Sequence, residues 1–142
     1  MLAGPLALFA ASLFTGAALY VSLAEQPARL QLEDAALLAE WKLSYARASI
    51  LQATLSLIGF AVAIVAGQQD GWRWFLGGIV LFANWPYTFL CVAPLSRKIS
   101  AFVPGTTTDV PLHALVAEWG HRHAVRTALG GVASLIFVWA IA

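Results

Sequence analysis

The sequence predicts an all-α, polytopic membrane protein: a bundle of four transmembrane helices that forms a single domain over residues 1–142. Hydrophobic residues make up 61% of the chain and charged residues only 11%, whereas soluble domains average roughly 45–50% and 25%. Four stretches are apolar over the roughly 20 residues that a helix needs to cross a bilayer. The other residues are too few for a second, soluble core. The formal net charge of +1 gives no sign of a nucleic-acid partner.

The first half of the chain predicts helices at about residues 2–25 and 33–67. The stretch Leu2–Ala24 carries no charge, and because its start lacks the basic residues of a signal peptide, we expect it to be a membrane helix. The second membrane stretch, Ala48–Gly67, follows Glu33–Tyr45, which has helical spacing and good helix formers. No Pro or Gly separates the two, so helix two should extend beyond the membrane.

The second half predicts helices at about residues 72–94 and 111–142. A turn over residues 68–71 should separate helices two and three, and an irregular segment over residues 96–110, with Pro104 and Gly105, should separate helices three and four. Helix four is apolar enough to cross the membrane at about residues 124–142. Helical spacing already begins at Pro111, after Asp109, whose residue type often caps helix N-termini. Helix four should therefore also extend beyond the membrane.

Basic residues set the expected orientation, because loops rich in Lys and Arg remain in the cytoplasm. The other side of the membrane holds only Arg73. We therefore expect an integral protein of a bacterial inner membrane, with both termini extracytoplasmic and the extensions of helices two and four on the cytoplasmic side. The basic residues that define the cytoplasmic side are Arg29, Lys42, Arg47, Arg97, Lys98 and Arg122.

Each predicted helix has a face of small and polar residues opposite a face of bulky aliphatic residues. In helix four, for example, His123, Arg126 and Gly130 lie opposite Val125 and Leu129 at about 100° per residue. Small residues let membrane helices approach closely, and polar groups in a membrane turn toward the bundle interior. We therefore expect one pocket that opens toward the cytoplasmic leaflet, where the polar ends of the four faces converge: Glu25, Arg29, Trp41, Tyr45, Gln52, Asn84, Tyr87, Thr88, Trp119, His123 and Arg126.

Simpler interpretations apply to parts of this set. Glu25, Arg29 and Arg126 would also suit interfacial positions, paired with one another or with lipid headgroups. Gln52 and Asn84 would also suit hydrogen bonds between helices, and the tryptophans would suit the aromatic belts at the membrane interfaces. These interpretations do not explain why all the polar positions fall at one depth.

The histidines do not form a metal site on their own helix. His121 and His123 are two residues apart, so they point about 200° apart around a helix. Glu118 and His121 have the spacing found in carboxylate-bridged di-metal bundles, but such sites need a second pair and further carboxylates. Glu118 suits a surface ion pair with Arg122 better. The sequence therefore predicts no metal or haem site within one chain.

The segment Trp119–Thr127, with the sequence Trp-Gly-His-Arg-His-Ala-Val-Arg-Thr, resembles a known signature. It is similar to the Trp-x-x-x-His-x-x-Arg-Thr motif of the DUF1772 membrane proteins, which include the anthrone oxygenases. The stretch Pro94-Leu95-Ser96, which a basic residue follows, resembles the Pro-Leu-Asn stretch of that family, with Ser96 in place of Asn. The four-helix layout and the length are also similar, so the resemblance covers nearly the whole chain.

The resemblance implies an oxygenase that acts on phenolic polycycles without a metal or flavin cofactor. An anthrone has an acidic C–H group, and the carbanion-enolate left after deprotonation reacts with O₂ directly. The protein must then supply a base, a cation for the developing oxyanion and a dry slot for flat rings. His123 would be the base and Arg126 the oxyanion partner, and Glu25 would orient His123 or neutralise Arg126. The expected substrate-binding residues are Trp41, Tyr45, Gln52, Asn84, Tyr87 and Trp119.

Two other functions remain open at the level of the sequence. One is a non-enzymatic helper, such as a small subunit of a larger membrane complex. The other is a small proton-coupled transporter in which Glu25 carries the proton, although the sequence has no detectable inverted repeat. The expected partners of the oxygenase are the lipid bilayer, a lipophilic small-molecule substrate and O₂, and a homo-oligomer or a membrane-protein partner stays open.

Overall fold

The computed structural model describes residues 2–142, which form four long helical rods and contain no strand. The first rod consists of α1 (Ala3–Tyr20), the π-helical turn η1 (Val21–Glu25) and α2 (Gln26–Arg29), and the second is α3 (Asp34–Asp70). The third consists of α4 (Trp72–Phe82), α5 (Asn84–Tyr87), the π-helical turn η2 (Thr88–Val92) and α6 (Ala93–Ser100), and the fourth is α7 (Leu112–Ile141). All four rods are long and apolar enough to cross a membrane. The protein is therefore an all-helical integral membrane protein.

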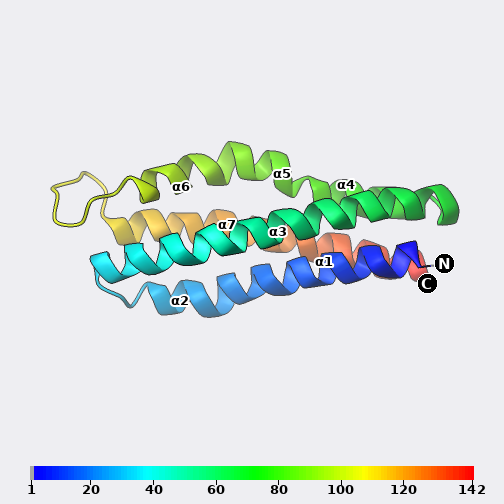
Figure 1. Cartoon of the computed structure of the whole chain (residues 1–142), viewed down its shortest axis with the longest axis horizontal. Coiled ribbons are helices and arrows are strands. Elements are labelled where there is room, and N and C mark those ends of the chain that lie inside the picture. The colour runs from blue at the N-terminus through cyan, green and yellow to red at the C-terminus, as the bar shows by residue number, and fades with distance from the viewer. Residues whose placement is uncertain (1) are drawn as a thin grey trace.

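The four rods run side by side along one axis, and successive rods run in opposite directions (Figure 1). The rod that begins with α1 packs against α3 and α7, and α4 also packs against α3 and α7. Both chain ends lie at the same end of the bundle as the turn between α3 and α4. The segments between α2 and α3 and between α6 and α7 lie at the opposite end, which we call the loop end.

The predicted helix extensions are present, and several predicted boundaries need correction. The helix through α3 continues to Asp70, so the predicted turn at residues 68–71 shortens to Gly71, whose φ of 109° favours glycine. The third rod continues past Pro94 to Ser100 because Pro94 falls in the first turn of α6, where proline is tolerated. The prediction that Asp109 caps helix four is wrong, since the N-cap residue is Pro111 and no side chain caps this helix.

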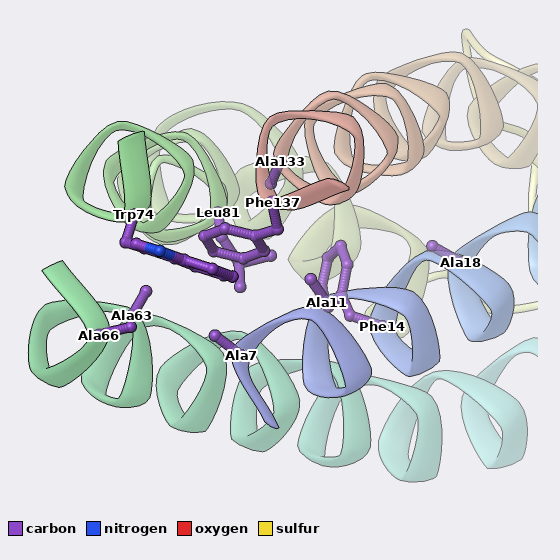
Figure 2. Close-up of a cluster of buried hydrophobic side chains, with 10 residues drawn as sticks. All are labelled: Ala7, Ala11, Phe14, Ala18, Ala63, Ala66, Trp74, Leu81, Ala133 and Phe137. Carbon is purple, nitrogen blue, oxygen red and sulfur yellow. The ribbon is translucent and has the colours of Figure 1, made fainter. Parts of the chain in front are cut away.

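Two separate apolar cores hold the bundle together. Figure 2 shows the core near the chain ends, where Trp74 and Phe137 point toward the bundle centre with their ring centroids 5.4 Å apart. Small residues allow this close packing: a Cβ added to Gly130 would lie 2.6 Å from the ring of Phe14. The core near the loop end contains Leu37, Trp41, Val92, Leu95, Ile99, Leu112, Val116 and Trp119. Each core contains side chains with no exposed surface.

A set of buried polar residues, which we call the polar layer, extends from between the two cores into the core near the loop end. Its members come from all four rods, as the helical-face argument predicts. Because each polar group there has left water, each needs a partner within the protein or in a ligand. The layer consists of Gln26, Arg29, Gln52, Ser56, Asn84, Ser96, His123 and Arg126, which are at most 8% exposed.

The third rod changes its helical form at the level of the polar layer. The regular helix ends at Phe82, and it resumes as α5, with Pro86 in its middle, and then as η2. Proline removes a backbone hydrogen bond and bends helices, and π-helical turns occur often at functional sites. Figure 1 shows α5 rising away from the axis of the bundle. The bend separates this part of the third rod from α3.

Candidate functional site

A cavity of about 280 Å³ lies between α3 and the bent segment formed by α5 and η2. This volume is just below the roughly 300–1,000 Å³ typical of small-molecule sites, so it suits a compact ligand. The cavity reaches inward to Arg126 of α7. Its lining is mostly apolar and aromatic, with a few polar groups at its inner end: Tyr45, Ser49, Ile50, Ala53, Ser56, Asn84, Trp85, Thr88, Phe89 and Arg126.

Arg126 is the one charged residue of this lining, and it is only 5% exposed. Within residues 2–142 its guanidinium group makes no hydrogen bond or ion pair, and its buried Nε atom has no partner. The nearest favourable feature is the ring of Phe14, whose centroid lies 5.8 Å from Cζ of Arg126. A buried cation without a counter-ion is costly, and its usual justification is a negatively charged or strongly polar ligand.

Two further polar atoms at the same cavity lack partners. Asn84 donates its amide to the carbonyl of Leu81 at 3.0 Å, and this leaves its buried Oδ1 atom without a donor. The buried Oγ1 atom of Thr88 has no hydrogen bond either. Arg126, Asn84 and Thr88 thus leave three unpaired polar atoms beside one cavity, where water or a polar ligand group would satisfy them. By contrast, the indole N–H of Trp85 at the same cavity has a partner, because it donates to Oγ of Ser56 at 3.1 Å.

His123 lies beside this cavity, and its ring is held on both edges. Its Nδ1 atom is 3.2 Å from Oγ of Ser22, and its Nε2 atom is 3.4 Å from Oε1 of Gln52. Oγ of Ser22 also lies 3.1 Å from Oγ1 of Thr127, so Ser22 contacts two residues of α7. The imidazole stacks on Trp119 with centroids 5.0 Å apart. The predicted inward orientation of His123, within reach of Gln52, is confirmed.

A separate small void of about 10 Å³ lies beside His123 and shares part of its lining with the cavity. Tyr45, Ser49 and Arg126 line both spaces, whereas His123 and Gln52 line only the small one. A space of this size with several polar walls is at the lower limit for holding one water molecule. His123 can therefore reach a ligand in the cavity through such a water or after a small movement of the Gln52 side chain.

The three aromatic residues predicted to stack on the substrate pack mainly on one another. The rings of Trp41 and Tyr45 are parallel with centroids 4.7 Å apart, and Trp119 meets Trp41 edge-on at 5.7 Å. Trp41 is fully buried and lines neither space, Trp119 lines only the small void, and Tyr45 alone lines the larger cavity. The aromatic walls of the larger cavity are instead Tyr45, Trp85 and Phe89.

Glu25 belongs to a separate ion-pair cluster near the loop end. Its carboxylate accepts from Arg29 at 2.7 Å and from Ser44 at 2.8 Å, and Arg29 also lies 3.0 Å from Glu40. No ion pair joins Glu25 to His123 or to Arg126 within the described chain. Tyr87 is also directed elsewhere, because its hydroxyl donates to the carbonyl of Arg122 at 3.1 Å. The structure thus does not bring Glu25 and Tyr87 to the cavity.

Potential metal ligands are dispersed. No group of three or more His, Cys, Asp or Glu side chains within residues 2–142 is close enough together to hold a metal ion. The side chain of His121 is 84% exposed, whereas His123 is buried, so the two point to different sides of α7 as expected. Glu118 pairs with Arg122 at 2.8 Å, which confirms the predicted surface pair.

Of the residues predicted for the site, the structure brings seven around the two neighbouring spaces: Tyr45, Gln52, Asn84, Thr88, Trp119, His123 and Arg126. The helical-face argument assigns no ligand role to Ser49, Ala53, Trp85 or Phe89. In that argument Trp85 suits an aromatic belt like the other tryptophans, and Phe89 and Ile50 lie on the outward face. Their signal was Pro86, whose bend turns an outward-facing stretch into a cavity wall.

Comparisons with known proteins identify one family. The family described as Anthrone oxygenase matches residues 41–136, which include every residue that lines the cavity. No curated protein and no solved structure matches the chain.

Proposed function

The chain belongs to the anthrone oxygenase family. We propose that it is a membrane-embedded enzyme that oxidises a lipophilic, anthrone-like aromatic molecule with O₂, without a metal or flavin. The observation that carries the proposal is the unpaired, buried guanidinium of Arg126 at the inner end of an aromatic-lined cavity. An enolate oxygen is the kind of group that would complete this site, because it is anionic and belongs to a flat, apolar molecule.

The chemistry requires one proton acceptor and one oxyanion partner. Removal of a proton from the methylene carbon of the anthrone leaves a carbanion-enolate. That carbon forms a bond to O₂, which is reduced to a peroxide, and loss of water from the peroxide leaves a second carbonyl group. One anthrone and one O₂ thus give one anthraquinone and one water.

The side chains around the cavity can serve both needs. The guanidinium of Arg126 would donate to the enolate oxygen, Oδ1 of Asn84 would accept from a hydroxyl group of the ligand, and the hydroxyl of Thr88 would bond to a further ligand oxygen. His123 would take the proton, directly or through a water in the small void. The apolar walls would exclude bulk water, which strengthens electrostatic stabilisation of the enolate.

We also propose that the protein resides in a bacterial inner membrane with the loop end in the cytoplasm. The support is the distribution of basic residues: Arg97, Lys98 and Lys42 lie toward the loop end, whereas Arg73 alone lies near the chain ends. A cysteine at Thr107, in the exposed segment between α6 and α7, should then be labelled only after intact cells are opened. Labelling from outside would reverse this orientation.

Oxygen uptake by the purified protein tests the enzymatic proposal. In lipid nanodiscs with anthrone as the substrate, the protein should accelerate O₂ consumption and anthraquinone formation in a ratio of one to one. Protein-free nanodiscs give the background of uncatalysed oxidation. If the protein adds nothing to this background and copurifies with a stoichiometric membrane partner, the proposal fails and the helper interpretation replaces it.

A further inference from the structure

The mouth of the cavity lies on the side of the bundle, between α3 and η2. Its rim includes Ile50 and Phe89, whose side chains are 71% and 62% exposed. The inner end holds Ser56, Asn84 and Arg126, which are at most 5% exposed. The cavity is therefore apolar and open at its outer end and polar and closed at its inner end.

Both ends of the bundle are closed to a ligand of this size. Toward the chain ends, the core of Figure 2 places Phe14, Leu81 and Phe137 across the interior without exposed surface. Toward the loop end, Trp41 and Ile99 belong to a second core that is packed equally well. A ligand that reached the cavity along the bundle axis would have to break one of these cores, whereas the side mouth needs no such change.

The mouth faces the level at which acyl chains surround the protein. Residues 48–69 of α3 and 74–96 of the third rod carry no charge, and each stretch is long enough to cross the roughly 30 Å hydrocarbon layer. Ile50 lies within the first stretch, one turn from Arg47, and Phe89 lies within the second. Leu51 and Leu90, next to the rim residues, are also exposed. An apolar outer surface on both sides of the mouth suits contact with lipid, not with water.

We propose that the substrate passes directly between the bilayer and the site, through the gap between Ile50 and Phe89, with its oxygen-bearing end leading. The identity of the substrate in this proposal rests on the proposed function. The proposal adds the route by which the ligand enters and the chemical class of ligand that the cavity accepts. The ligand is a compact molecule that dissolves in the acyl-chain layer and carries an anionic or carbonyl oxygen at one end. That oxygen reaches the guanidinium of Arg126, and the apolar body remains between Tyr45, Trp85 and Phe89.

The rate at which a stable ring compound binds tests the route without any turnover. Alizarin, a dihydroxyanthraquinone, is mixed with the protein in lipid nanodiscs, and the quenching of tryptophan fluorescence is followed by stopped flow. Ile50→Phe narrows the mouth and should slow association and dissociation about tenfold, whereas Phe89→Ala widens it and should accelerate both. For Ile50→Phe, the dissociation constant should change less than either rate. Leu51→Phe and Leu90→Ala are matched controls beside the mouth, and they should bind alizarin at the wild-type rates.

The possible results separate the route from the proposed function. Unchanged rates in both rim variants, or no binding of alizarin by the wild-type protein, overturn the route. Equal changes in the controls would also overturn it, because they would indicate a general effect of the lipid-facing surface. If the rim variants behave as expected and anthrone is not oxidised, the route stands and the oxygenase proposal fails. If anthrone is oxidised but the rim variants bind alizarin at the wild-type rates, the oxygenase proposal stands and the route fails.

Discussion

Replacing Arg126 by glutamine is expected to lower kcat for anthrone oxidation by about 10²–10³-fold, the usual effect of removing one donor to a developing oxyanion. The reason is that Arg126 is the one cation at the cavity and has no other partner in the described chain. Arg126→Lys should also be impaired, because a flexible ammonium group does not replace a planar guanidinium. Steady-state oxygen uptake in nanodiscs measures both variants.

The thermal stability of the same variants separates a catalytic from a structural role. An unpaired buried charge costs free energy in the folded state, so Arg126→Gln should unfold at the wild-type temperature or above it. Arg97→Gln is the matched control, since it removes an exposed positive charge that has no contact with the cavity. A large drop in the Tm of Arg126→Gln, with activity lost in proportion to the unfolded fraction, would show that Arg126 serves the fold instead.

Replacing His123 by alanine is expected to lower turnover by about 10²–10⁴-fold, as for the loss of a positioned general base. His123 is the one histidine in the polar layer, and Ser22 and Gln52 hold its two nitrogen atoms. The His123→Ala variant should bind alizarin with a dissociation constant close to that of the wild-type protein, because His123 does not line the larger cavity. The measurements are oxygen uptake and equilibrium quenching by alizarin on one preparation.

His121→Ala is the matched control, two positions away on the same helix. Its side chain is 84% exposed, so turnover should remain at the wild-type level. His123→Gln serves as a second variant, since it preserves a polar group beside Trp119 if the alanine variant loses stability. Retention of wild-type turnover by a folded His123→Gln or His123→Ala variant would remove His123 from the mechanism, and a water or another group would have to act as the base.

The helical periodicity of the sequence was sufficient to predict which residues face the bundle interior. Small and polar residues share one face of each rod, and a membrane penalises any other orientation of groups such as Gln52, Asn84 and Arg126. This constraint acts locally on each helix, so it does not require knowledge of the neighbouring helices. It correctly predicts that Arg29, Gln52, Asn84, His123 and Arg126 are buried, and it does not select Gln26 or Ser96.

The shape of the cavity could not be predicted in the same way, because it depends on departures from regular helix. Pro86 predicts a bend but not its direction, and no sequence pattern predicts the π-helical turns η1 and η2. The bend at Pro86 and the turn η2 place Trp85 and Phe89 at the cavity. Regular periodicity instead favoured Trp41 and Trp119, which pack in the apolar core near the loop end. The pair of Glu25 with Arg29 is local, with i,i+4 spacing, and the sequence suggests it, whereas the contact of Arg29 with Glu40 depends on how α3 approaches α2.

We propose that the side chains of this protein carry out the oxidation without a bound metal or flavin. The metal and flavin content of active protein is therefore determined, together with its turnover of anthrone before and after treatment with a strong chelator. Turnover should not scale with metal or flavin content, and it should survive chelation unchanged. Stoichiometric iron or copper, with turnover lost on chelation and restored by adding the metal back, would contradict it.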